Sequence, residues 1–171
     1  MNCDSQHEPK GADEWDSWLQ LQAPRLLLFA RQQARSEPDA HDLVQEAVVE
    51  AWEFAAGSPP PAGLVFSIIR RRAIDLGRRE DRRLKREAAA LAGGEPDWFA
   101  PEIEDRERGR LLQDALGRLP EIQRSVVTLK VWGGLTFAEI AEALDIPANT
   151  AASRYRYALE ELRQFTKEVF A

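Results

Sequence analysis

Apolar residues recur three and four positions apart along most of the chain, and this spacing predicts α-helices nearly throughout. Alternating strand-like patterns are absent, so we predict an all-α protein. A first helix is expected to start near Asp13 or Asp16. Pro24 is expected to begin or kink the next helix, because proline lacks the N–H that a helix interior needs. Further helices are predicted over 39–54, from 64 towards 90, from near 103 and from about 120.

The segment 135–162 predicts two helices separated by a tight turn. Thr136 and Glu139 have the spacing of a capping box, which marks the start of the first helix. That helix ends at Asp145-Ile146-Pro147, because proline disfavours helical geometry in the residue before it. The second helix has one apolar side, whereas short polar residues and arginine occupy the other. An ordinary helical hairpin is the alternative, but the joint spacing favours a DNA-binding helix-turn-helix.

Residues that break helices divide the chain into two parts. The segment 57–63 is rich in glycine and proline and predicts a stiff loop. The segment 92–102 combines such residues with acidic ones and predicts a flexible acidic linker. We therefore expect two small helical domains, of which the second ends in the helix-turn-helix. The predicted organisation is a disordered tail at 1–13, a first domain at 14–91, the linker at 92–102 and a second domain at 103–171.

Charge alternates strongly along the chain although the net charge is only −6. Residues 1–60 carry −7, residues 70–86 carry +6 and residues 95–107 carry −5. Nine Lys and Arg residues within seventeen positions exceed what solubility requires, so the basic block predicts a surface for nucleic-acid phosphates. The alternative is a solvated arginine-rich helix. Blocks of opposite sign suggest that different surfaces meet different partners.

Several function classes are disfavoured by the composition. Cys3 is the only cysteine, and His7 and His41 are the only histidines, so neither a metal cluster nor another cofactor is expected. The chain has no phosphate-binding glycine loop and no nucleophile–base pair, which argues against an enzyme and a small-molecule substrate. It also has no apolar run that could span a membrane and no signal peptide, and we therefore expect cytoplasmic residence.

Three groups of residues resemble the minimal two-domain type of bacterial extracytoplasmic-function (ECF) sigma factor, of the sigma-70 superfamily, over about residues 19–165. They are Asp42-Leu43-Val44-Gln45-Glu46 with Trp52, the segment 68–79, and the segment from Leu116 through the helix-turn-helix. The resemblance implies that 14–91 is a region 2-like domain and 103–171 a region 4-like domain. It implies that core RNA polymerase is bound by Asp42, Leu43, Gln45, Glu46 and Trp52.

The resemblance also implies two sets of DNA contacts. The loop 57–63 would capture an extruded base of the −10 promoter element. The −10 element would be bound by Arg70, Arg71, Asp75, Arg78, Arg79 and Arg82. The −35 element would be bound by Asn149, Thr150, Ser153, Arg154, Arg156 and Tyr157.

The chain departs from the family pattern in both DNA-binding helices. Arg71 stands where the family usually has asparagine, and Leu64 where a tryptophan often opens the −10 helix. The second helix of the helix-turn-helix is less basic than usual, with Ala152, Tyr157 and Leu159 at positions that are commonly charged. Tyr157 is therefore left with two interpretations, a DNA contact or a packing residue.

The function implied is that of an RNA polymerase sigma factor, which directs promoter recognition and DNA melting. Its expected partners are the clamp and flap of core RNA polymerase, promoter DNA and an anti-sigma factor. No C-terminal regulatory domain is expected, because the chain ends soon after the last predicted helix. A helix-turn-helix regulator that works without polymerase is the alternative. It accounts for the second domain, but it leaves the 42–52 helix and the basic block unassigned.

Overall fold

The computed structural model describes residues 10–55, 58–84, 98–99 and 106–169. Within these ranges it contains seven α-helices and no strand, which confirms the all-α prediction. None of the described helices is long and apolar enough to cross a bilayer. The helices are α1 (Lys10–Gln33), α2 (Glu37–Phe54), α3 (Ala62–Leu84), α4 (Arg106–Gly117), α5 (Glu121–Val131), α6 (Phe137–Leu144) and α7 (Ala148–Val169).

The first helices differ from the prediction at two places. Residues 10–33 form one helix that contains Pro24, so the expected new start at Pro24 is wrong. The helix α2 begins two residues earlier than predicted, because Ser36 is its N-cap and accepts a hydrogen bond from the Asp39 N–H (3.3 Å). The predicted extension of α3 towards residue 90 falls on residues 85–90, outside the described ranges, as do residues 1–9 of the predicted tail.

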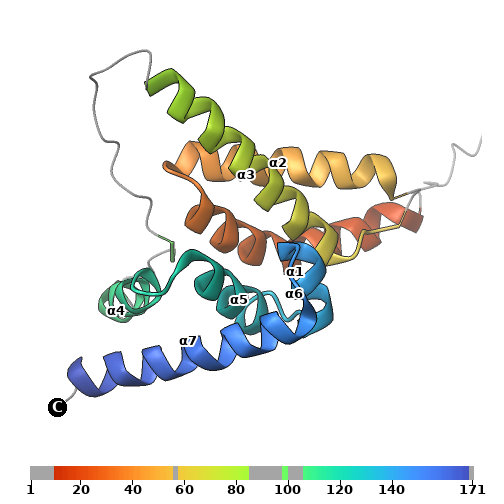
Figure 1. The fold of residues 1–171 in the computed structure, drawn as a ribbon. Coiled ribbons are helices and arrows are strands. Elements are labelled where there is room, and N and C mark those ends of the chain that lie inside the picture. The colour runs from red at the N-terminus through yellow and green to blue at the C-terminus, as the bar shows by residue number, and fades with distance from the viewer. Residues whose placement is uncertain (1–9, 56–57, 85–97, 100–105, 170–171) are drawn as a thin grey trace, which may run out of the picture.

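The seven helices form two halves that pack against each other (Figure 1). In the first half α2 packs against α1 and α3, and in the second α7 packs against α5 and α6. The halves meet where α6 lies on α3 and α5 lies beside α1. One hydrophobic cluster crosses this junction, and its largest members include Leu26, Phe29, Phe66, Ile69, Leu129, Ile140 and Leu144. Burial of these side chains is the main force that holds the halves together.

A second hydrophobic cluster includes a residue of the predicted linker. Trp98 is only 7% exposed and packs with Leu28, Leu116, Val127 and Ala158. These partners come from α1, α4, α5 and α7. At Trp98 and Phe99 the linker is thus packed into the fold, whereas residues 92–97 and 100–102 lie outside the described ranges. The predicted domain boundaries remain a prediction.

Candidate nucleic-acid interface

The helix α2 presents a polar and partly aromatic face to solvent. Asp42, Gln45, Glu46 and Trp52 are exposed, and the Trp52 ring lies 5.5 Å from that of Trp15 between centroids. These four lie on the surface, as a docking face requires. The side chain of Leu43 is 4% exposed and belongs to the hydrophobic core, and its part in polymerase docking stays a prediction.

Two arginines at the middle of α3 are bound by acidic residues of α2. Arg71 forms an ion pair with Glu50, and Arg72 bridges Glu50 (2.8 Å) and Glu46. Hydrogen bonds from Arg71 and then Arg72 hold the pKa of Glu50 below its usual value, although desolvation opposes this shift. Ion pairs therefore join α2 to α3, so the acidic and basic blocks of the sequence do not form two separate surfaces at this point.

The other predicted −10 residues have varied surroundings. Arg70 is half-buried, and its Nη1 atom is buried without a hydrogen-bond acceptor. Arg78 and Asp75 are exposed, and the Arg78 Nη1 atom lies 4.0 Å from the Asp75 Oδ1 atom. The side chains of Arg79 and Arg82 lie outside what the structure describes. The predicted set thus includes exposed groups at both Arg71 and Arg78, about two helical turns apart.

The helix α3 begins at Ala62, so the last two residues of the predicted loop 57–63 are helical, and this end of α3 lies next to the helix-turn-helix. Pro60 is buried, and a Cβ atom placed on Gly63 would lie 3.7 Å from the Cβ of Glu139 in α6. Residues 56 and 57 lie outside the described ranges. The loop predicted to capture a base is therefore close to α6 in this arrangement.

The helix-turn-helix itself has the predicted local geometry. The Thr136 N–H donates to a Glu139 carboxylate oxygen (2.7 Å), and the Glu139 N–H donates to the Thr136 hydroxyl (3.3 Å). Hydrogen bonds from Thr136 lower the pKa of Glu139. Asp145 ends α6 in the left-handed region, at φ 53° and ψ 53°. The capping box and the turn residue are thus confirmed.

The helix α7 buries one side and exposes another. Ala151 and Ala158 are buried, and Tyr155 packs on Phe137 with 5.6 Å between ring centroids. Tyr157 is 60% exposed, so in this arrangement it is not a packing residue. The other predicted −35 residues are exposed (Asn149, Arg154, Arg156) or half-buried (Thr150, Ser153).

Comparison with known proteins assigns both halves. Residues 20–83 match the family model for Sigma-70 region 2, and residues 109–162 match the model for Sigma-70, region 4. The ECF RNA polymerase sigma factor RpoE of Cereibacter sphaeroides is 33% identical over 147 residues, which cover 83% of this chain and 80% of that protein. The chain belongs to the ECF sigma factors. The ECF sigma factor SigL of Mycobacterium tuberculosis is 30% identical over 135 residues, or 76% of each chain.

A solved structure supports the fold of this sigma factor. The fold of this chain is similar to that of the sigma factor RpoE of Bartonella quintana, which was solved in complex with the anti-sigma factor NepR. The TM-score is 0.65 at 23% identity, and the alignment covers 91% of this chain and 98% of the other. Sigma factors are transcription initiation factors and not enzymes of the usual kind. In this sigma factor, region 2 comprises most of α1 with α2 and most of α3, and region 4 comprises most of α4 to α7.

Proposed function

We infer that this protein directs RNA polymerase to promoters and opens the DNA there. The observation that carries this inference is the order of the two matches, region 2 at 20–83 and region 4 at 109–162, on one chain. Region 2 combines the exposed face of α2 with the arginines of α3, and region 4 holds the helix-turn-helix. Recognition and opening are binding events, so the protein needs no covalent chemistry of its own.

Each surface has a physical role in this proposal. The exposed Asp42, Gln45, Glu46 and Trp52 dock on core polymerase, since an acidic helix face repels DNA phosphates. The α3 arginines bind the backbone of the opened strand near the −10 element, where Glu46 and Glu50 orient the guanidinium groups of Arg71 and Arg72.

At the −35 element, α7 enters the major groove. Arg154 is placed to contact bases or phosphates, because its side chain is exposed on α7 beside the buried stripe of Ala151 and Ala158. Asn149, Thr150, Ser153, Arg156 and Tyr157 surround it. The short polar side chains and Tyr157 position the helix on the DNA backbone.

Binding partners follow from the relatives. The RpoE of Bartonella quintana was solved with an anti-sigma factor, and an inhibitor of the same class fits a protein of this family. A factor that acts with polymerase on chromosomal promoters works in the bacterial cytoplasm. The alternative, a regulator that needs no polymerase, predicts tight and specific promoter binding by the isolated protein.

Charge reversal in α3 tests the −10 assignment. We expect Arg78→Glu with Arg79→Glu to lower permanganate reactivity of promoter thymines by at least about tenfold, or ~1.4 kcal/mol, in complexes with core polymerase. Closed-complex formation, measured by gel shift, should change less. The reason is that these arginines contact DNA only once the strands have separated.

A matched control carries the same change in charge elsewhere. Arg110→Glu with Arg163→Glu alters two exposed arginines of α4 and α7 that are not assigned to DNA. This variant should keep permanganate reactivity near that of the parent protein. Unchanged reactivity in the Arg78 and Arg79 variant would remove the −10 assignment. Tight promoter binding without polymerase would favour the regulator.

A further inference from the structure

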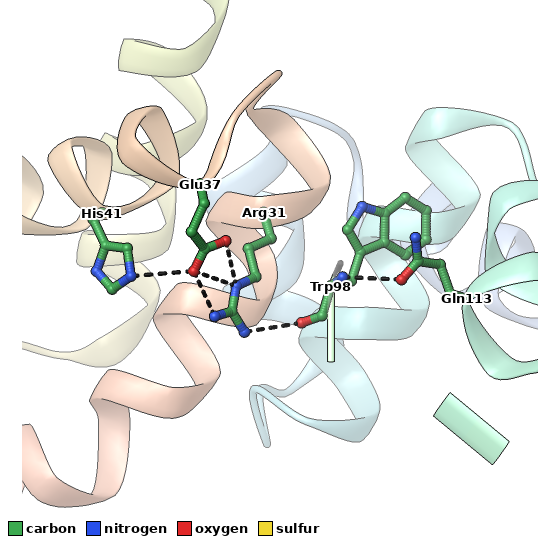
Figure 2. Close-up of polar contacts among 5 residues, drawn as sticks. All are labelled: Arg31, Glu37, His41, Trp98 and Gln113. Carbon is green, nitrogen blue, oxygen red and sulfur yellow. Dashed lines mark hydrogen bonds and ion pairs between the residues drawn. The ribbon is translucent and has the colours of Figure 1, made fainter. Parts of the chain in front are cut away.

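Trp98 connects the two halves of the molecule although it belongs to no helix (Figure 2). Its side chain packs with Leu28 of α1 from the first half and with Leu116, Val127 and Ala158 from the second. The guanidinium of Arg124 lies 4.9 Å from the centre of its ring. A buried tryptophan that contacts both halves contributes more apolar area to their junction than other residue types offer.

The backbone of Trp98 adds a polar bridge between the same halves. Its carbonyl accepts a hydrogen bond from Arg31 of α1 (3.2 Å), and its N–H donates to Gln113 of α4 (2.9 Å). Arg31 is held in place by the Glu37 carboxylate at 2.6 Å, and Glu37 also contacts His41 (Figure 2). Hydrogen bonds from Arg31 lower the pKa of Glu37, so Glu37 stays ionised as a support for Arg31.

Phe99 extends the connection to the end of α5. Its ring lies 5.7 Å from that of Trp132, between centroids. A Cβ placed on Gly109 of α4 would lie 3.8 Å from the Phe99 Cβ, in ordinary van der Waals contact, so Phe99 lies beside α4. Both residues of the dipeptide are thus seated against the second half, and Trp98 also reaches the first.

The junction between α1 and α5 is partly polar and imperfectly satisfied. Thr128 donates to the Gln32 amide oxygen (2.9 Å), and Gln33 donates to Ser125 (3.4 Å). The Gln32 amide nitrogen is buried without an acceptor. Unsatisfied buried groups cost free energy, and a polar junction is typical of domains that separate and rejoin.

We propose that Trp98 and Phe99 form a latch that holds the region 4 half on the region 2 half and is withdrawn when the halves separate. The latch supplies apolar contact on both sides and a backbone bridge from Arg31 to Gln113. The α1–α5 contact beneath it is partly polar, whereas the α3–α6 contact is apolar. Its significance for transcription rests on the proposed function, whereas the latch itself does not.

The exposure of a buried thiol measures the opening directly. Ser125 is fully buried beside α1, so Ser125→Cys in a Cys3→Ser background places a nearly isosteric thiol in the junction. A maleimide reagent reaches this thiol only when the halves part. We expect Trp98→Ala to accelerate its modification by at least about tenfold, or ~1.4 kcal/mol. Phe99→Ala should accelerate it less, because Phe99 is only half-buried against the hydrophobic cluster in which Trp98 is 7% exposed.

A second thiol separates opening of the junction from general loss of structure. Ala51 is fully buried within region 2, and Ala51→Cys provides the control thiol in the same backgrounds. The rate at which maleimide modifies the thiol at position 51 should be unchanged by Trp98→Ala. Equal acceleration at positions 51 and 125 would overturn the latch, as would an unchanged rate at 125 in a folded Trp98→Ala protein. If Trp98→Ala fails to fold, the thiol modification rates at positions 125 and 51 are measured in Gln113→Ala and Phe99→Ala instead, and the same outcomes support or overturn the latch.

The outcome for the proposed function is read separately. Failure to support transcription with core polymerase would overturn that function, yet the thiol rates would still report the latch. Conversely, unaltered thiol rates in a protein that transcribes would remove the latch alone.

Discussion

At the scale of single residues, Asp145 combines a backbone conformation and a charge that are both unfavourable at its position. Among the described residues it is the only one besides glycine with positive φ, and its N–H donates to the carbonyls of Ala141 and Glu142 at the end of α6. Left-handed backbone costs about 1–2 kcal/mol for most residues, and aspartate tolerates it better than they do. Its negative charge also lies at a helix C-terminus, where the helix dipole disfavours it.

Substitutions at Asp145 should therefore follow backbone preference and charge. We expect Asp145→Ala to lower the free energy of unfolding by about 1 kcal/mol. Asp145→Asn should raise it by a few tenths of a kcal/mol, because it removes the charge and keeps the tolerance. Asp145→Gly removes the strain but adds entropy to the unfolded chain, so its gain stays below ~1 kcal/mol. Urea unfolding monitored by circular dichroism measures the free energy of unfolding of each variant. An alanine variant as stable as the glycine variant would contradict the prediction.

At the scale of elements, the sequence predicts what depends on near neighbours. The capping box at Thr136 and Glu139 and the turn at Asp145 were predictable, because the interacting groups lie within a few residues. Pro24 was not, since its cost inside α1 is offset by the packing of Leu26, Phe29 and Ala30 against other helices. The start of α2 was missed because serine at an N-cap is a weaker signal than the apolar pattern.

The helix α7 yields a prediction at the same scale. If Arg154 reads a base, Arg154→Ala should weaken promoter binding by polymerase carrying this factor by about 1–3 kcal/mol and relax preference at one −35 position. Arg163→Ala, an exposed arginine of α7 that pairs with Glu160, should change binding by less than ~0.5 kcal/mol. Binding to a panel of −35 substitutions measures both. A uniform loss across the panel would instead assign Arg154 to phosphate, and no loss would place it away from DNA.

At the scale of the whole molecule, the packing of region 4 on region 2 was beyond prediction from the sequence. The apolar faces of α3 and α6 predict which residues are buried, yet they do not indicate against which helix. Helix breakers around Trp98 favoured a linker without packing, although the tryptophan itself was a signal of burial. The pairing of Arg72 with Glu50 was missed because the two residues lie 22 positions apart in the chain and on different helices.

The same packing allows the halves to be locked covalently. A Cβ on Gly63 lies 3.7 Å from the Glu139 Cβ, within the ~3.5–4.5 Å that a disulfide spans. We expect Gly63→Cys with Glu139→Cys, in a Cys3→Ser background, to form a disulfide under mild oxidation. Because the disulfide would hold α6 beside the loop at 58–61, the locked protein should lose at least about tenfold in promoter opening, or ~1.4 kcal/mol.

Reduction by dithiothreitol should restore activity to the level of the reduced double variant. Each single cysteine variant, treated with the same oxidant, is the matched control, and Glu139→Cys alone also reports the loss of the capping box, about 1 kcal/mol. Run-off transcription with core polymerase gives the readout. Full transcription by the cross-linked protein would mean that region 4 stays on α3 in the working complex. In that case the loop at 58–61 would have to bind DNA while α6 remains beside it.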